Sequence, residues 1–142
     1  MTASKAFFDT NILLYVYSKA DLRKQAKALA LYREHALEGR LLLSTQVVQE
    51  FIVSALRKLA LARQQVREIA VTLLDSPLVV VGPPHIQTAL DNAERYAISF
   101  WDALILAAAE AGGAEVLYTE DLNDGQSYGG IVARNPFRQP AE

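Results

Sequence analysis

The stretch FFDTNILLYVYS, residues 7–18, begins as an apolar strand and continues as an apolar helix. Asp9, Thr10 and Asn11 lie between the two halves. A carboxylate beside so much hydrocarbon is costly in free energy unless it is hydrogen-bonded, paired with an opposite charge or bound to a cation. The position of Asp9 therefore predicts that side chains from elsewhere in the chain meet it there.

Short apolar runs alternate with helical patterns along the whole chain, which has 142 residues. Strands are expected at 5–8, 41–44, 78–84 and 115–119, with a short fifth strand at 129–133. Helices are expected at about 12–18, 21–39, 45–59, 63–74, 85–96 and 99–111. Uniformly apolar strands that alternate with helices indicate a parallel sheet covered on both faces. The predicted fold class is α/β, a three-layer α/β/α sandwich whose central, mostly parallel sheet has about four to five short strands, in a single domain over residues 1–142.

Composition narrows the class of protein. Hydrophobic residues make up 51% of the chain, which is ample for one core. No run reaches about 18 uncharged apolar residues, and the first acid comes too early for a signal peptide. We therefore expect a soluble, cytoplasmic protein with no membrane contact. Zero cysteines exclude disulfides and thiolate metal sites, and a formal charge of -2 does not by itself indicate a nucleic-acid binder.

Acidic residues also follow the fourth predicted strand, in YTEDLNDG, residues 118–125. In a parallel sheet the ligand site lies beyond the carboxyl ends of the strands, so Asp9 and Asp121 are candidates for one crevice. Asp, Asn and Gly are also the usual turn residues at strand ends. A role as a turn residue explains Asp124 better than a role in a ligand site does. For Asp121 the turn role and the ligand-site role are equally supported.

Asp102 is the only charged residue between Ser99 and Glu110, in a helix that is apolar on every side. Ser99 and Asp102 have the spacing of a capping box, which would explain the acid without any chemistry. A cap also places the carboxylate at the helix N-terminus, which in this architecture faces the crevice. A helix so apolar should be buried, and a buried charge needs more than one capping bond.

The sequence supports Glu50 as a site residue less strongly than it supports the three aspartates. A helical wheel at about 100° per residue puts it off the centre of the apolar stripe. Taken alone, Glu50 is a solvated helical glutamate, and only its place in the second turn of a helix that follows a strand favours the crevice. The stripe of this helix is predicted at Val48, Ile52, Ala55 and Leu59, and that of the preceding helix at Ala26, Leu29, Ala30 and Leu37.

Several carboxylates in one crevice repel each other and raise each other's pKa, so such a cluster is tolerated mainly around a cation. The chain has no cysteine and only two histidines, His35 and His85, both of which we expect at the surface. Hard oxygen ligands of this kind favour Mg²⁺ or Mn²⁺. The chemistry they indicate is metal-assisted attack of water on a phosphodiester.

Four motifs together resemble the PIN domain family, and within it the VapC-type toxins of bacterial and archaeal toxin–antitoxin pairs. Each motif is weak alone, but the ordered set is fairly specific, and the resemblance runs from Phe7 to the Asn135-Pro136-Phe137 tail. The motifs are Asp9-Thr10-Asn11, Glu50, Ser99-Phe100-Trp101-Asp102-Ala103 and Thr119-Glu120-Asp121.

The resemblance implies a PIN-like sandwich, a Mg²⁺- or Mn²⁺-dependent endoribonuclease acting on RNA, a homodimer, and neutralisation by a small antitoxin protein. It also implies roles for particular residues. The acidic quartet that binds metal and positions water is Asp9, Glu50, Asp102 and Asp121, supported by Asn11, Thr119 and Ser99, with Asp124 as a further candidate.

Other interpretations fit less well. A haloacid-dehalogenase-type hydrolase needs a second acid two residues after the first, where this chain has Asn11. A receiver domain needs a lysine at the end of a late strand, and YTEDLND contains none. The alternative from another class is a catalytically silent PIN-like module that acts in protein or RNA assembly. Four carboxylates kept in register argue against it, since a degenerate site need not retain them.

Overall fold

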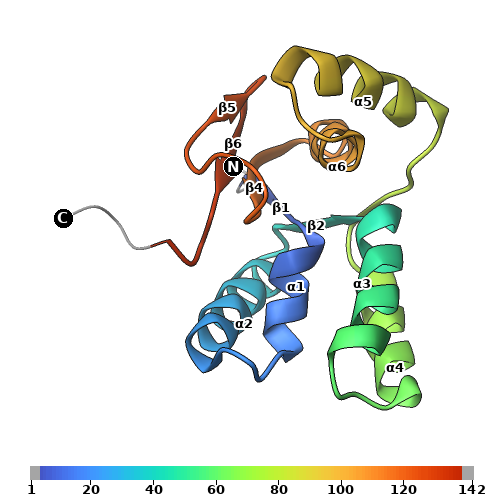
Figure 1. The fold of residues 1–142 in the computed structure, drawn as a ribbon, viewed down its shortest axis with the longest axis vertical. Coiled ribbons are helices and arrows are strands. Elements are labelled where there is room, and N and C mark those ends of the chain that lie inside the picture. Colours follow the sequence, from blue (N-terminus) through green and yellow to red (C-terminus); the bar gives the residue numbers. More distant parts are fainter. Residues whose placement is uncertain (1–3, 139–142) are drawn as a thin grey trace.

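A sheet of six strands lies between two layers of helices in the computed structural model, which describes residues 4–138 (Figure 1). The order across the sheet is β3-β2-β1-β4-β6-β5, and every neighbouring pair is parallel except β5 with β6. The strands are β1 Lys5–Phe8, β2 Leu41–Ser44, β3 Leu78–Val79, β4 Ala114–Tyr118, β5 Ser127–Tyr128 and β6 Ile131–Arg134.

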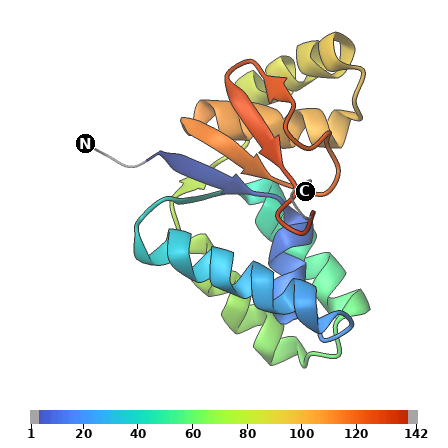
Figure 2. The same cartoon turned by 90° about the vertical axis from the view of Figure 1, so that its left-hand side faces the viewer.

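Helices cover both faces of this sheet (Figures 1 and 2). Helices α1 to α4 pack on one face, and α5 and α6 pack on the other. The predicted α/β class and three-layer arrangement are confirmed. The helices are α1 Thr10–Tyr17, α2 Leu22–Leu37, α3 Thr45–Lys58, α4 Arg63–Leu74, α5 Pro83–Tyr96 and α6 Phe100–Ala111.

The chain changes direction across the sheet at β1. β2 and β3 follow on one side of it, whereas β4 and β6 lie on the other side. Phe8 pairs in register with Tyr118, and the Asp9 N–H donates to the Tyr118 carbonyl at 3.0 Å. The crevice at such a switch point, beyond the carboxyl ends of the strands, is the usual place for a ligand in an open parallel sheet. Asp9 and the loop after β4 therefore meet where a ligand is expected.

The central strands are buried because helices pack on both of their faces. Phe8 of β1, Leu43 of β2 and Leu117 of β4 are each 0% exposed. Burying a large aliphatic or aromatic side chain contributes about 1.5–3 kcal/mol. The uniformly apolar sequence of these strands thus accounts for their position at the centre of the sheet.

Helix α6 is almost as deeply buried as the strands, because it lies between the sheet and α5. Every residue from 103 to 109 is buried, and the many alanines among them let neighbouring elements approach closely. Just beyond the helix, a Cβ on Gly112 would overlap Leu42 Cδ2 and lie 2.9 Å from Val79 Cγ2. Gly112 is therefore required by packing, since its φ of -84° suits any residue.

The third strand is shorter than predicted. Only Leu78–Val79 of the expected range 78–84 pairs in the sheet. Pro83 and Pro84 instead open α5 at its first positions, where a missing N–H is tolerated and the fixed φ of proline suits a helix. The apolar run misled the prediction because the valines that follow β3 continue as an extended connection to α5.

The sheet has one strand more than the four to five that we predicted. Ser127–Tyr128 forms β5, which pairs antiparallel with β6. Gly129 and Gly130, which were expected inside the last strand, make the turn between these strands with φ values of 61° and 96°. Left-handed backbone of this kind favours glycine. A strand of two residues is too short to produce a detectable alternation in the sequence.

The face of α2 that packs on the core also differs from the predicted one. The packed face carries Ala28, which is fully buried, with Leu31 and Tyr32 partly buried against the core. Leu31 and Tyr32 bury more apolar area than alanines, and this decides the rotation of the helix. The predicted positions were largely wrong: Ala26 and Ala30 are exposed, Leu37 is 87% exposed, and Leu29 is half-buried.

The two histidines do not lie on the surface as expected. His35 is 3% exposed and lies against the rings of Phe8 and Tyr118, with centroid distances of 5.3 and 5.5 Å. Its Nδ1 lies 2.8 Å from the Leu31 carbonyl, which satisfies the polar group inside the core. His85 is half-buried, and its Nδ1 accepts from the Gly82 N–H at the start of α5. Both histidines thus have structural partners.

None of the helices in residues 4–138 combines the length and the apolar character that crossing a membrane requires.

Candidate functional site

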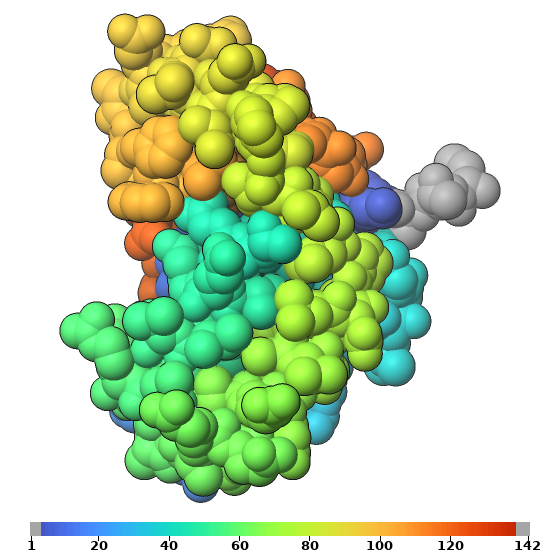
Figure 3. Space-filling model, turned by 90° about the vertical axis from the view of Figure 1, so that its right-hand side faces the viewer, coloured from blue at the N-terminus to red at the C-terminus, as the bar shows by residue number. Residues whose placement is uncertain are grey.

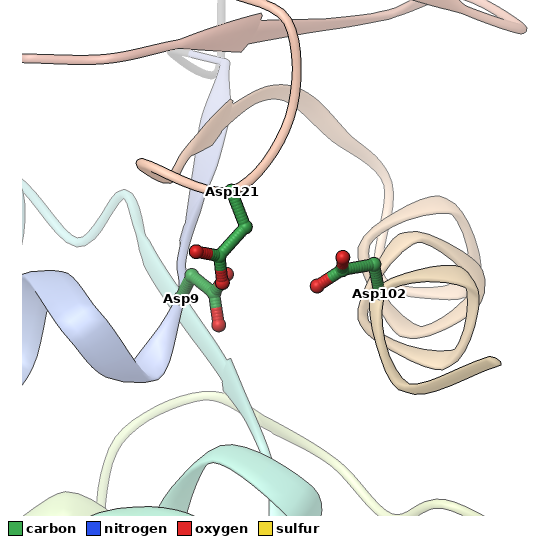
Figure 4. A group of neighbouring side chains, drawn as sticks. All are labelled: Asp9, Asp102 and Asp121. Carbon is green, nitrogen blue, oxygen red and sulfur yellow. The ribbon is translucent and has the colours of Figure 1, made fainter. Parts of the chain in front are cut away.

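Three aspartates that are far apart in the sequence meet at the switch point of the sheet. Asp9 follows β1, Asp102 lies in the first turn of α6, and Asp121 follows β4. Each offers a carboxylate oxygen, and these oxygens all lie within 4.8 Å of one another. Figure 4 shows Asp9 and Asp121 side by side, with the Asp102 carboxylate pointing toward them from its helix. The structure thus brings together three of the four acids predicted from the sequence.

Asp9 is 5% exposed, and both of its carboxylate oxygens accept hydrogen bonds. The Thr10 N–H donates to Oδ1 at 2.7 Å, and the Thr119 hydroxyl donates to Oδ2 at 2.7 Å. The Thr119 oxygen in turn accepts from the Asp121 N–H at 3.0 Å. Thr119 therefore connects two of the aspartates and holds the loop after β4 against the end of β1.

The environment raises the pKa of all three carboxyl groups. Burial raises the pKa of Asp9 to about 7, against opposing hydrogen bonds from Thr119 and Thr10 and with smaller contributions from the nearby acids. Burial is also the largest cause of the raised pKa of Asp102 and of Asp121. Like charges add to both shifts, and a cation bound among the carboxylates would act in the opposite direction.

Glu50 faces the same cleft as the three aspartates, one helix away. The Thr10 hydroxyl donates to its Oε1 at 2.8 Å, so Glu50 and Asp9 are linked through Thr10. Its negative charge raises the pKa of both Asp9 and Asp102, although burial is the larger cause in each case. Periodicity was correct that Glu50 lies off the buried stripe, but the face it occupies lines the cleft.

Ser99 and Asp124 have structural roles in this geometry. Ser99 caps α6, and its hydroxyl accepts from the Asp102 N–H at 3.1 Å, as the capping spacing predicted. Asp124 lies away from the aspartate cluster, where its Oδ1 accepts from the Asn135 N–H at 2.9 Å. This bond ties the loop after β4 to the segment after β6, which agrees with the interpretation of Asp124 as a turn residue.

An ion pair holds the side chain of Glu120 away from that of its neighbour Asp121. Its Oε2 lies 2.8 Å from Lys24 Nζ on α2, and the same ammonium group donates to the Tyr15 hydroxyl at 3.2 Å. The Lys24 charge also lies over the Tyr15 ring, 4.7 Å from its centroid. The pair directs Glu120 toward α2, which leaves Asp121 as the acid of this loop that faces the cluster.

A cleft of about 540 Å³ opens beside the aspartates, between α1, α3 and α6. In Figure 3 the outline of the molecule is indented on the left, between α6 in orange and α3 in green. Sequence reasoning did not identify several of the lining residues, because neither a motif nor an isolated charge marks them. These additional residues include Gln46, Gln49, Val53 and Ser54 of α3, Ile105 of α6, and Leu14 of α1. Trp101 of α6, which belongs to one of the quoted motifs, also lines the cleft.

The residues present fit a hydrated divalent cation. Three carboxylate oxygens within 4.8 Å form the hard donor set that Mg²⁺ and Mn²⁺ prefer. Asn11 lines the same cleft, and within residues 4–138 its buried Oδ1 has no hydrogen-bond partner. A buried acceptor of this kind needs a donor, and water bound to the ion would supply one.

Comparisons with known proteins agree with this fold. The sequence profile described as PIN domain matches residues 6–123 of the chain. No curated protein gives a match. Similar solved structures include a toxin–antitoxin complex from Klebsiella pneumoniae, with a TM-score of 0.68, 23% identity, and coverage of 95% of this chain and 100% of that chain.

Two further structures have the same fold at lower identity. The Mycobacterium tuberculosis toxin VapC20, which cleaves the sarcin–ricin loop, has a TM-score of 0.67 and 19% identity, with coverage of 82% of this chain and 90% of that chain. DNA-bound VapBC from Salmonella typhimurium has a TM-score of 0.66 and 16% identity, with coverage of 94% of this chain and 99% of that chain. Likeness at these identities establishes the fold.

Proposed function

The chain belongs to the PIN domain family, and on this premise we propose that it is a divalent-metal-dependent endoribonuclease, which hydrolyses RNA phosphodiester bonds. The observation that carries the proposal is the meeting of Asp9, Asp102 and Asp121 within 4.8 Å at the switch point of the sheet. A binding module has no need to bury a carboxylate beside two others, because that arrangement destabilises the fold unless a cation is bound.

The three aspartates are the residues that would hold Mg²⁺ or Mn²⁺. Such an ion stabilises negative charge on phosphoryl oxygens and lowers the pKa of a bound water. Asp9 is fixed in place by hydrogen bonds to both of its oxygens, and the backbone of Asp121 by the hydrogen bond from its N–H to Thr119. Ligands held this firmly need little rearrangement when the substrate arrives, which favours catalysis.

Glu50 is placed to move a proton. Its Oε1 already accepts from the Thr10 hydroxyl, so Oε2 remains to accept the proton of the attacking water. In the proposed reaction the water oxygen bonds to phosphorus as the bond from phosphorus to one ribose oxygen breaks. That ribose oxygen takes up a proton, and Glu50 releases the one that it accepted, so that one water is added across the broken bond. The products are one RNA end with a phosphate monoester and one with a hydroxyl.

The proposal extends to partners. Structures with the same fold are a toxin–antitoxin complex and a DNA-bound VapBC, and from these we infer that this chain is the toxin of a pair with its own antitoxin protein. A cytoplasmic homodimer is part of the same proposal. Exposed apolar side chains on α3 and α5, including Val53 at 56% and Leu90 at 57%, offer surface for association. Sedimentation of the purified protein tests the dimer.

Replacement of a single acid tests the activity itself. Asp121→Asn removes one ligand charge and should lower the Mn²⁺-dependent RNA cleavage rate by at least about a hundredfold, since metal stabilisation of the transition state is worth several kcal/mol. Asp124→Asn is the matched control, because it lies in the same loop and can keep the hydrogen bond to Asn135. Cleavage of total RNA is followed on gels, with and without chelator.

Equal activity in the two variants would remove Asp121 from the mechanism. Cleavage that persists in chelator would contradict the requirement for metal. If the parent protein binds RNA but neither cleaves it nor responds to divalent ions, the chain is a catalytically silent module and the proposed function is wrong.

A further inference from the structure

Trp101 lines the cleft next to Asp102, yet the residue is 62% exposed. The Phe100 ring packs against it edge-on, with a centroid distance of 5.4 Å and an interplanar angle of 70°. The backbone at this position is fixed as well, because Trp101 lies in the first turn of α6 after the Ser99 cap. The site therefore presents a large aromatic face to solvent on a rigid support, directly beside a proposed metal ligand.

Gln46 lies across from this helix, and its amide is incompletely satisfied. The side chain is 5% exposed, and its Nε2 donates to the Trp101 carbonyl at 3.3 Å. A carbonyl oxygen only accepts, so this bond determines which end of the amide is Nε2. Among residues 4–138, the buried Oε1 has no hydrogen-bond partner. An unpaired buried acceptor costs about 1–3 kcal/mol, and a donor on a molecule bound in the cleft would remove this cost.

The neighbourhood of these two groups is unsuited to a second metal ion. The cleft wall near them is partly apolar, with Val53 of α3 and Ile105 of α6 among its lining residues. At about 540 Å³ the cleft also has more room than one hydrated ion occupies. A flat aromatic face beside a single hydrogen-bond acceptor matches a nucleobase, which has a π face for stacking and an N–H on its edge.

We propose that Trp101 and Gln46 form a base-binding site that positions RNA over the aspartate cluster. An unpaired base next to the scissile phosphate stacks on the Trp101 indole and donates an amino or imino N–H to Gln46 Oε1. This inference rests on the proposed endoribonuclease function and adds to it how the substrate is held. It requires that the base is out of a duplex when cleavage occurs, because a paired base cannot present both its face and its edge.

The single tryptophan of the chain makes the site directly observable. Stacking of a base on the indole should quench its fluorescence. The parent protein is titrated in calcium buffer with short oligoribonucleotides, and with an abasic oligomer of the same length. The RNA is checked by gel to be intact afterwards. Saturable quenching by the oligoribonucleotides and none by the abasic oligomer is the expected result.

Variants then measure the contribution of each group to affinity, by anisotropy of a labelled oligoribonucleotide. Trp101→Ala should weaken binding between about fivefold and about a hundredfold, and Trp101→Phe should retain part of the affinity. Gln46→Leu should weaken binding between about twofold and about tenfold. Leu37→Ala is the control for loss of an exposed apolar side chain, since Leu37 is 87% exposed at the end of α2. It should leave binding unchanged.

The abasic oligomer separates base contact from general damage, because its affinity should be the same for Trp101→Ala and for the parent. Equal quenching by the abasic oligomer, or unchanged affinity in Trp101→Ala, would overturn the base-binding site. The base-binding site would also be overturned if Trp101→Ala lost affinity only because a dimer dissociated, which sedimentation would show. If the parent neither binds nor cleaves any RNA, the proposed function itself has failed, and this outcome is distinct from the others.

Discussion

At the scale of single residues, Asp9 carries the largest energetic penalty of the site. The residue is 5% exposed, and burial raises its pKa to about 7. The hydrogen bonds from Thr10 and Thr119 offset only part of this penalty. A residue whose charged form is so disfavoured in the fold makes the stability of the metal-free protein depend on pH.

The sign of that dependence follows from two pKa values of Asp9, the ordinary one in the unfolded chain and the raised one in the fold. Between a pH near 3.8 and about 7, folded Asp9 holds a proton that the unfolded chain has released. The free energy of unfolding therefore falls as pH rises through this window, and the contribution of Asp9 is lost above it. In chelator, Asp9→Asn should unfold with a weaker pH dependence than the parent and gain in relative stability above pH 7. Urea titrations at several pH values measure both. Parallel stability curves for the two proteins would contradict this account of Asp9.

At the scale of secondary-structure elements, the junction between α5 and α6 is a point of strain. Ala97 ends α5 with φ 52° and ψ 47°, in the left-handed region that a side chain disfavours. Helices usually place glycine at such a position. The left-handed conformation of Ala97 lets the chain turn from α5 into the Ser99 cap of α6, which sets the direction of the helix that carries Asp102.

Ala97→Gly should therefore stabilise the protein, by up to about 1.6 kcal/mol. Glycine relieves the cost of about 1–2 kcal/mol for the left-handed backbone, and its extra freedom in the unfolded chain takes back about 0.4–1 kcal/mol. Thermal melts measure the effect. Ala30→Gly on the exposed face of α2 is the control, and it should destabilise by about 1 kcal/mol. Destabilisation by both substitutions would show that Ala97 is not strained.

At the scale of the whole molecule, the site couples metal binding to folding. The three aspartates come from β1, α6 and the loop after β4, so only the folded chain brings their oxygens within 4.8 Å. A ligand that binds the folded state alone stabilises it in proportion to the logarithm of its concentration. The effect needs deprotonated carboxylates, so it should shrink as pH falls below the raised pKa of Asp9.

Excess Mn²⁺ should raise the melting temperature by several degrees at neutral pH, since about 2.7 kcal/mol is gained at a hundred times the dissociation constant. The double variant Asp9→Asn with Asp102→Asn should lose this shift. Asp75→Asn with Asp91→Asn is the control, because it removes two exposed charges instead, one just after the end of α4 and one on α5. All melts are run at constant ionic strength. An equal shift in both double variants would mean that the aspartates do not form a metal site.

The sequence by itself determined the order of the helices and of every strand except β5, and the placement of acids after β1 and β4. These features depend on local causes: apolar runs make strands, Ser99 caps α6, and polar residues follow where pairing ends. Since parallel strands end at one edge of a sheet, a meeting of Asp9 with Asp121 was predictable without coordinates.

Only the tertiary structure decided which face each helix buries and what else enters the site. The packed face of α2, the burial of His35 and the strand β5 all depend on neighbours distant in sequence. The same holds for Gln46, an ordinary polar helix residue until the fold brings the first turn of α3 to the first turn of α6 and places the Trp101 carbonyl within reach. A local pattern records what each segment tends to form, whereas the energy of side-chain packing depends on partners that only the assembled fold supplies.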